Sequence, residues 1–279
     1  MASLKGKVAL VTGASKPNGI GAAIALRLAR EGADVVVADL CEQLSAEYPG
    51  YCRTGSNDDL MALAEKIAGL GVHAVAAPID VTDTKMVQAV AERVEKEFGR
   101  LNILCNNAGG APGPQTIANM EEKAWQKTME INLTGTWRVT KHLTPLLIKG
   151  GRGGAIVNTA SRAGKVPSAF MSGYCTAKAG LIMLTKVTAL EMAPHGIRVN
   201  CICPGQVETD LGAWGWGMRA FSKGMNMEQY RELMAKEIPL GRPASPDECA
   251  NVVFWLVSEE ASFITGQAVN VTGGQLMEL

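Results

Sequence analysis

The feature that most constrains the fold is a regular alternation of short apolar runs, rich in β-branched residues, with segments of helical periodicity. The apolar runs lie at residues 8–11, 35–37, 72–76, 103–105, 155–158, 198–203 and 268–271. Continuous apolar strands separated by helices are typical of a parallel sheet that is covered on both faces. The sequence therefore predicts an α/β fold with a doubly wound, mostly parallel seven-stranded sheet.

The helical segments have recognisable periods and ends. Ile20, Ile24 and Leu28 recur at four-residue spacing and predict the first helix. Further helices are expected at about residues 58–70, 82–98 and 172–193, and a long one at 121–148 that is bent or interrupted near Gly135. Because no linker, repeat or low-complexity tract divides the 279 residues, we expect a single domain spanning residues 1–279.

Two segments do not fit the alternation. Residues 41–57 contain Tyr48-Pro49-Gly50 where a tight turn would suffice, and they predict an inserted loop beside the end of the second strand. Residues 211–227 hold several tryptophans and methionines among four glycines. That composition favours an irregular, mobile, apolar substrate lid within about residues 207–237.

Charge and cysteine content exclude several classes of protein. The 27 basic and 27 acidic residues cancel, so no basic field favours nucleic acid or an anionic membrane. No apolar run is long enough to cross a bilayer and the first residues lack a signal-peptide core, so we expect a cytoplasmic protein. Seven scattered cysteines, without a C-x-x-C pair and with three histidines, predict reduced thiols and no metal site.

A glycine-rich turn follows the first predicted strand. Gly13, Gly19 and Gly21 stand where the turn of a parallel sheet aims a helix N-terminus at phosphate. Five residues separate Gly13 from Gly19, so the G-x-G-x-x-G spacing is not met and a purely structural turn remains an alternative.

An acidic residue ends the second predicted strand. Asp39 lies eighteen residues after Gly21, where a carboxylate can accept both hydroxyls of an adenosine ribose. It would repel a 2′-phosphate and so favours NAD over NADP, although Lys16 in the turn can offset part of that repulsion. The alternative for Asp39 is a cap of the local backbone.

A candidate acid/base pair stands on the helix at residues 172–193. Tyr174 and Lys178 are four residues apart and project from one face. A neighbouring ammonium favours the phenolate of a tyrosine, whose ordinary pKa is about 10. Ser161, after the fifth strand, can hydrogen-bond a substrate oxygen as charge develops.

These residues and their order resemble the classical short-chain dehydrogenase/reductase family over residues 5–274. The motifs are Thr12-Gly13 with Gly19-Ile20-Gly21, Asn106-Asn107-Ala108-Gly109, Ser161, Tyr174-x-x-x-Lys178 and Pro204-Gly205. The resemblance implies a Rossmann fold and an NAD(H)-dependent enzyme that interconverts a secondary alcohol and its ketone. It further implies that Asn132 supports a proton-relay water; the alternative is a buried amide that bonds a helix backbone.

The resemblance also implies which residues hold the cofactor and the substrate. The cofactor set comprises Gly13, Ser15, Asn18, Gly19, Ile20, Gly21, Asp39, Leu40, Asp80, Val81, Asn107, Ala108, Gly109, Tyr174, Lys178, Pro204, Gly205, Val207 and Thr209. Thr209 is expected to bond the nicotinamide carboxamide, and Asp80 and Val81 to meet the adenine, although Asp80 also suits a strand end and helix cap. The substrate set comprises Ser161, Tyr174, Gln206, Trp214 and Trp216.

The chain departs from the family pattern at two places. Pro17 and Asn18 widen the glycine turn, which leaves the position of Ser15 and Lys16 in doubt. The insert at 41–57 looks like that of the carveol-dehydrogenase-like branch, which implies a loop that covers the adenosine half of a tightly held NAD; a surface loop is the alternative.

Other functions remain open at this point. An apolar or cyclic alcohol suits the lid, whereas a polyol or an acetoin-like diol would be bonded by Gln206, Glu208 and Arg162. A non-catalytic NAD-binding regulator on the same fold is the alternative of another class. The resemblance implies a homotetramer formed through the helices at 121–148 and 172–193, and the second of these is apolar on more than one side.

Overall fold

The computed structural model describes residues 3–41 and 55–278. Seven parallel strands in this part form one sheet in the order β3-β2-β1-β4-β5-β6-β7. They are β1 (Val8–Thr12), β2 (Asp34–Asp39), β3 (Ala74–Pro78), β4 (Ile103–Asn106), β5 (Ala155–Thr159), β6 (Arg198–Pro204) and β7 (Ala268–Val271). The predicted fold class is confirmed, with the third strand two residues later than expected.

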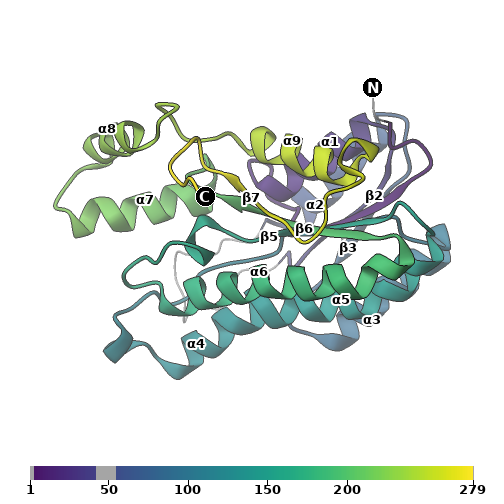
Figure 1. Cartoon of the computed structure of the whole chain (residues 1–279), viewed down its shortest axis with the longest axis horizontal. Helices are drawn as coiled ribbons and strands as arrows, with labels where there is room; N and C mark the ends of the chain where they lie inside the picture. Colours follow the sequence, from purple (N-terminus) through teal and green to yellow (C-terminus); the bar gives the residue numbers. More distant parts are fainter. Residues whose placement is uncertain (1–2, 42–54, 279) are drawn as a thin grey trace.

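Helices cover both faces of this sheet (Figure 1). One layer contains α1 (Ile20–Arg30), α2 (Asn57–Ala68) and α9 (Pro246–Val257). The opposite layer contains α3 (Thr84–Phe98), α5 (Gly135–Lys149) and α6 (Ser172–Met192), with α4 (Glu122–Met129) at its end. Two further helices, α7 (Asp210–Ser222) and α8 (Met227–Glu237), extend beyond the sheet and form the segment predicted as the lid, which keeps that name below.

The sheet separates two apolar cores. Val11 belongs to the core cluster that contains Leu28 of α1 and Leu256 of α9. Its neighbour Leu10 belongs to the cluster on the other face, with Leu143 of α5. Successive strand residues point to opposite faces of the sheet. Because helices cover both faces, both sets of residues must be apolar, which explains the uninterrupted β-branched runs. Within these strands, the polar residues that line the cavity described below are the last ones, Asp39 of β2 and Thr159 of β5.

The long helix expected at 121–148 is interrupted, as predicted. A π-helical turn, Glu130–Thr134, joins α4 to α5, and Gly135 follows it directly. A Cβ on Gly135 would lie 2.7 Å from Cγ2 of Val81 and 3.0 Å from the carbonyl oxygen of Glu130. The glycine is thus required by close packing against the loop after β3.

The lid is more regular than its composition indicates, so the prediction of an irregular segment at 211–227 was wrong. The hydroxyl of Thr209 caps α7 by accepting a hydrogen bond from the backbone N–H of Gly212 at 3.0 Å. Asn226 and Gln229 form a reciprocal capping box at the start of α8. Capping and the packing of one helix on the other outweigh the low helix propensity of glycine.

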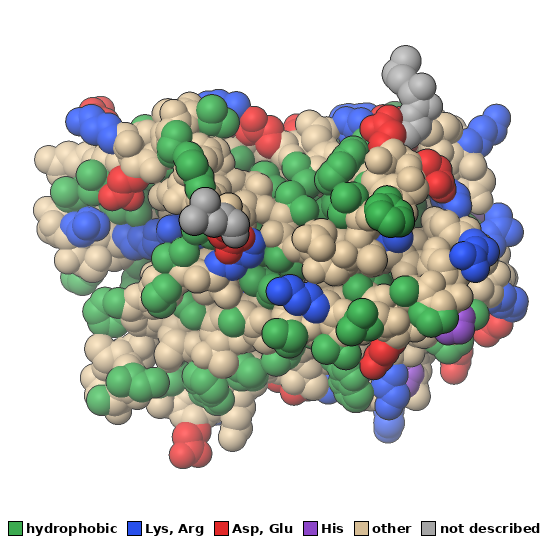
Figure 2. Space-filling view, in the orientation of Figure 1, with side chains coloured by type: hydrophobic (Ala, Val, Ile, Leu, Met, Phe, Trp, Pro, Cys, Tyr) green, Lys and Arg blue, Asp and Glu red, His purple; other side chains and the backbone are tan. Residues whose placement is uncertain are grey.

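Three further observations concern the molecule as a whole. Basic and acidic side chains are interspersed over the face in Figure 2, in keeping with the balanced sequence charge. Among the described residues, no helix is both long and apolar enough to span a bilayer, and no group of three or more His, Cys, Asp or Glu is placed to hold a metal ion. Apart from its two ends, the insert predicted at 41–57 lies outside the described residues.

Candidate active site

A cavity of about 900 Å³ opens where the strands end. The residues predicted for the site that line it are Gly13, Asn18, Gly19, Ile20, Asp39, Leu40, Asp80, Val81, Asn107, Ala108, Gly109, Ser161, Tyr174, Lys178, Pro204, Gly205, Gln206, Val207, Thr209, Trp214 and Trp216. Ser15, Gly21, Asn132 and Glu208 do not line it. One cavity therefore collects the glycine turn, the candidate acid/base pair and the lid.

The glycine turn forms one end of the cavity and is packed against the loop after β4. A Cβ on Gly21 would lie 2.2 Å from the carbonyl oxygen of Gly13, and one on Gly13 would lie 2.8 Å from Cα of Ala108. Gly19 precedes α1 and no side chain caps that helix, so its first N–H groups stay available to an anion. The wide turn keeps the close backbone approach and the free amides that a pyrophosphate needs.

Asn107 ties this turn to the neighbouring loop. Its Nδ2 donates to the carbonyl oxygens of Thr12 at 3.2 Å and Gly13 at 3.0 Å. In return, the hydroxyl of Thr12 accepts from the backbone N–H groups of Asn107 and Ala108. The loop residues predicted to lie near the adenosine ribose are thereby fixed in place by side-chain to backbone bonds.

Asp39 faces both the cavity and the turn. One carboxylate oxygen accepts from the backbone N–H of Ser15 at 2.8 Å and from its hydroxyl at 2.5 Å, and the other accepts from the N–H of Leu40 at 2.8 Å. The local capping foreseen as the alternative is therefore present. Ser15, predicted to touch the cofactor, is buried, and its hydroxyl donates to Asp39. Asp39 itself stays half-buried at the cavity wall.

Asp80 also caps local backbone, as its alternative interpretation indicated. Its carboxylate accepts from the N–H of Thr82 at 2.8 Å and from the hydroxyl of Thr82 at 2.7 Å. The next acidic residue, Asp83, is the N-cap of α3. Both Asp80 and Val81 nevertheless line the cavity, at the end that also contains Asp39.

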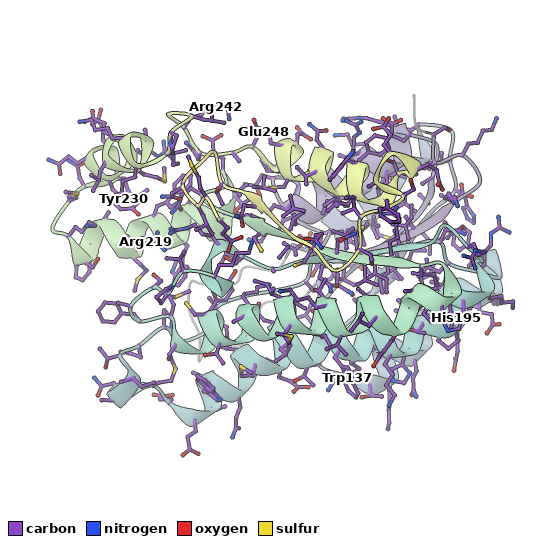
Figure 3. All side chains as sticks on the ribbon, in the orientation of Figure 1. Trp137, His195, Arg219, Tyr230, Arg242 and Glu248 are labelled. Carbon is purple, nitrogen blue, oxygen red and sulfur yellow. The ribbon has the colours of Figure 1, made fainter. Side chains whose placement is uncertain are left out.

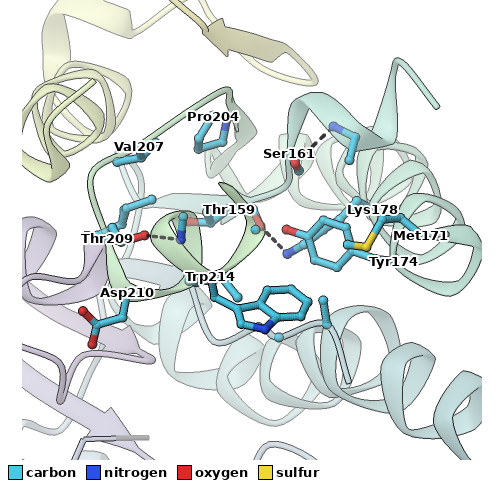
Figure 4. Close-up of a pocket in the computed structure, with 18 of the residues that line it drawn as sticks. Thr159, Ser161, Met171, Tyr174, Lys178, Pro204, Val207, Thr209, Asp210 and Trp214 are labelled. Atoms are coloured by element: carbon cyan, nitrogen blue, oxygen red, sulfur yellow. Dashed lines mark hydrogen bonds between the residues drawn. The ribbon is translucent and has the colours of Figure 1, made fainter. Parts of the chain in front are cut away.

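The candidate acid/base pair lies on the first two turns of α6 (Figure 4). Nζ of Lys178 donates to the carbonyl oxygen of Thr159 at 2.8 Å and lies 5.6 Å from the ring centroid of Tyr174. Lys178 is only 3% exposed, and this burial lowers the pKa of its ammonium to about 8. A cation beside a phenol, held by the end of β5, is the arrangement that stabilises a phenolate.

Ser161 completes this group from the end of β5. Its hydroxyl oxygen accepts from the backbone N–H of Ala163 at 3.1 Å, which caps the short helical turn Arg162–Gly164. The hydroxyl keeps its own hydrogen for another acceptor. Ser161 and Tyr174 thus reach the same cavity from β5 and α6, and each can contact one substrate oxygen.

Asn132 lies behind the cavity wall in the π-helical turn. Its Nδ2 donates to the carbonyl oxygens of Gly110 at 2.6 Å and Thr128 at 2.8 Å, and its Oδ1 accepts from the N–H of Gly110 at 3.2 Å. The amide therefore bonds backbone, as the alternative interpretation held. A Cβ on Gly109 would lie 3.0 Å from Asn132 Oδ1 and 3.3 Å from Lys178 Nζ, so the two polar groups flank one glycine.

Trp216 links the lid to the strand end more than it faces a substrate. It is 3% exposed and belongs to a small cluster with Ala220 and, from α8, Tyr230 and Met234. Its indole Nε1 donates to Oε1 of Gln206 at 2.7 Å, so both residues predicted for the substrate are partly engaged with each other. The hydroxyl of Thr209, predicted to bond the nicotinamide carboxamide, accepts from the N–H of Gly212 in α7.

The lid is joined to the glycine turn by contacts that sequence reasoning missed. Nζ of Lys16 lies 3.0 Å from a carboxylate oxygen of Asp210, and Nδ2 of Asn18 donates to the other at 2.7 Å. Asp210 is the first residue of α7. Almost two hundred residues separate the partners in the chain, and no local pattern marks such a contact. Arg219, which also lines the cavity, was missed for the same reason.

The fold, the cavity and the Ser161, Tyr174 and Lys178 group define an oxidoreductase of the Rossmann type. A family model described as "Enoyl-(Acyl carrier protein) reductase" matches residues 13–275. The chain belongs to the classical short-chain dehydrogenase/reductase family.

Individual relatives in this family carry different activities. The 3-oxoacyl-[acyl-carrier-protein] reductase FabG of Thermotoga maritima is 35% identical and covers 97% of this chain and 98% of its own. The (-)-trans-carveol dehydrogenase of Rhodococcus erythropolis is 35% identical with 100% coverage of both chains. The galactitol 2-dehydrogenase of Agrobacterium fabrum is 35% identical and covers 98% of this chain and 99% of its own.

Two solved structures are similar over almost the whole chain. The carveol dehydrogenase of Mycobacterium avium in complex with NAD has a TM-score of 0.92, 31% identity and 100% coverage of both chains. An actinorhodin polyketide ketoreductase variant with NADPH has a TM-score of 0.86, 34% identity and 99% coverage of both chains. A nicotinamide cofactor is thus common to these neighbours, in either its phosphorylated or its unphosphorylated form.

Proposed function

We propose that this protein is an NAD(H)-dependent oxidoreductase that interconverts a secondary alcohol and its ketone, with Tyr174 as acid/base. The observation that carries the proposal is the buried ammonium of Lys178, held by the carbonyl oxygen of Thr159 beside the ring of Tyr174. Burying a cation is costly unless a counter-charge or hydrogen bonds compensate for the lost water. The phenolate of Tyr174 is such a counter-charge, and Ser161 shares the cavity with it.

Each of these residues has one role. In the oxidation direction Tyr174 takes the proton of the substrate hydroxyl, while the hydroxyl of Ser161 donates to the same oxygen and fixes it. Lys178 stabilises the phenolate before the transfer. The bound nicotinamide supplies the redox chemistry by accepting or returning the hydride. Asn132 next to Lys178 positions the loop at Gly110 and supports a proton path beyond the lysine.

The unphosphorylated cofactor is favoured by the charge at the end of β2. Asp39 is held by Ser15 and Leu40 with its carboxylate at the cavity wall, where a 2′-phosphate would meet a fixed negative charge. Lys16 is engaged with Asp210 and is therefore not free to offset that repulsion fully. Both observations support NAD over NADP.

A small secondary alcohol is favoured over a polyol. Trp214, Met218 and Phe170 line the lid side of the cavity with apolar surface. Of the residues that could bond sugar hydroxyls, Gln206 already accepts from the indole of Trp216, and Glu208 does not line the cavity. A non-catalytic regulator would have no use for Ser161, Tyr174 and Lys178 in one cavity.

We also propose that the protein works as a homotetramer assembled partly through α5 and α6. Exposed apolar side chains gather on these two helices, which lie in one layer (Figure 1). Trp137 is 45% exposed on α5, and Met183 and Leu190 are 59% and 78% exposed on α6. Such surface favours burial against another copy.

The test measures turnover of a panel of secondary alcohols with NAD and with NADP, using the absorbance of the reduced nicotinamide as the readout. Tyr174→Phe removes the acid/base without changing the ring, and we expect kcat to fall about 10³-fold while cofactor binding is retained. NAD is expected to be the better cofactor. Undiminished turnover by the variant would contradict the proposal, and binding of NAD with no turnover of any alcohol would favour a regulator.

A further inference from the structure

The part of the cavity beyond Ser161 is cationic. Lys127, Arg162 and Arg219 line it, whereas the acidic lining residues among those described, Asp39, Asp80 and Asp210, stand at the strand ends and the glycine turn or pair with it. The two ends of one cavity therefore differ in charge. An apolar alcohol needs no cation on its side of the cavity.

Arg162 has little within the protein to balance its charge. The residue is half-buried, and its guanidinium forms no hydrogen bond or ion pair with the described part of the chain, whereas its backbone carbonyl accepts from the N–H groups of Lys165 and Val166. Burial lowers the pKa of its guanidinium, and the charge of Arg219 lowers it further, whereas Glu237, Tyr230 and Cys175 act in the opposite direction. Glu237 is exposed at the end of α8 and does not line the cavity. Two guanidiniums that repel one another across a cavity favour an anion between them.

Arg219 reaches this place from the lid. It lies on α7 (Figure 3), and a guanidinium nitrogen is 3.4 Å from the hydroxyl of Ser168, which also lines the cavity. Arg162 comes from the turn after β5, directly after Ser161 in the chain. An anion bound by both arginines would lie between the turn after β5 and α7. It would be in the same cavity as the substrate oxygen that Ser161 and Tyr174 are proposed to contact.

We propose that the substrate carries an oxyanion, a carboxylate or a phosphate, which Arg162 and Arg219 bind between them. The inference rests on the proposed alcohol and ketone chemistry and narrows its substrate class to hydroxy acids or hydroxyalkyl phosphates with their keto forms. A guanidinium presents two parallel N–H donors that match either group. Because Arg219 belongs to α7 and Arg162 to the turn after β5, an anion bound by both would also hold α7 against that turn.

The experiment compares matched alcohols that differ in charge. The carboxylate arm uses 3-hydroxycyclohexanecarboxylate and its methyl ester; the phosphate arm uses glycerol 3-phosphate and glycerol. Wild-type protein is expected to prefer one anion over its neutral partner by at least about 30-fold in kcat/KM. Arg162→Gln and Arg219→Gln should each reduce that preference at least about tenfold, through KM of the anionic alcohol.

A control variant separates anion binding from lid packing. Arg231→Gln removes a guanidinium of α8 that lies 5.8 Å from the Trp216 ring and outside the cavity, and it should keep the preference. Circular dichroism and thermal unfolding verify that each variant is folded. A preference that is equal in wild type, Arg162→Gln and Arg219→Gln, or neutral partners that react as well as both anions, would overturn the inference and leave the alcohol chemistry intact.

A binding measurement keeps the two proposals distinguishable. Cyclohexanecarboxylate lacks the hydroxyl and cannot react, so its binding to NAD-saturated protein is measured without turnover, by tryptophan fluorescence or calorimetry. Methyl cyclohexanecarboxylate serves as the neutral control for the contribution of the ring. Binding that is lost in both arginine variants supports the inference even where every alcohol in the panel is inert. No binding of this acid or of cyclohexyl phosphate at millimolar concentrations would contradict it.

Discussion

Lys178 shows how a single residue connects burial with chemistry. Its ammonium is almost inaccessible and donates a hydrogen bond to the carbonyl oxygen of Thr159. Burial lowers its pKa from an ordinary 10.5 to about 8. The folded protein therefore binds a proton here less readily than the unfolded chain does. Keeping Lys178 protonated beside Tyr174 lowers the free energy of unfolding.

The sign of the resulting pH dependence follows from this shift. Between about pH 8 and 10.5 the unfolded chain retains a proton that the folded protein has lost, so the contribution of Lys178 to stability rises with pH. The free energy of unfolding of wild type, relative to Lys178→Met, should increase by about 2 kcal/mol from pH 7 to pH 9.5. Urea unfolding at the two pH values measures it. A difference that is constant or falls with pH would show that the pKa is not lowered in the folded state.

At the scale of elements, α7 is the segment whose structure differs most from the sequence-based prediction. Its glycines at 212, 215 and 217 predict an irregular segment, yet a helix forms because Thr209 caps it and Trp216 packs on α8. The strands, by contrast, are recognisable from the sequence because burial on both sheet faces dictates each residue type locally. Tyr174 and Lys178 were found for a similar reason, since helical spacing alone places them together. Long-range pairs such as Lys16 with Asp210 leave no such local trace.

The glycines of α7 offer a direct test of lid stability. A Cβ on Gly215 would meet no atom within 4 Å, so Gly215→Ala should stabilise the helix by up to about 1 kcal/mol. Slower hydrogen exchange of the amides in α7 measures the effect. Where lid opening limits turnover, kcat falls as well.

Gly212→Ala is the matched control in the same helix. Its Cβ would lie 2.1 Å from the carbonyl oxygen of Val207, so this variant should loosen the start of α7 and accelerate exchange. Equal exchange in the two alanine variants would contradict the helical packing described for the lid.

At the scale of the whole molecule, the exposed apolar surface on α5 and α6 is the interface of the proposed homotetramer. Leu190 is 78% exposed, so Leu190→Lys leaves the fold of one chain intact while it places a charge in the proposed interface. We expect a smaller species in sedimentation velocity at micromolar concentration. Ile117→Lys, at a side chain that is 79% exposed outside these helices, should sediment as wild type does. An unchanged assembly in Leu190→Lys would exclude this face as the interface.

The contacts of Lys16 and Asn18 with Asp210 join the glycine turn to the start of α7. The first is assigned above to the cofactor and the second to the substrate. In the proposed function, the glycine turn contacts the phosphates of the nucleotide and α7 encloses the alcohol or ketone. By thermodynamic reciprocity, whatever draws Lys16 away from Asp210 weakens the closed lid, and whatever holds the lid closed keeps Lys16 from a competing phosphate. Making and breaking the contact between Lys16 and Asp210 would then affect both the choice between NAD and NADP and the retention of the alcohol or ketone under α7.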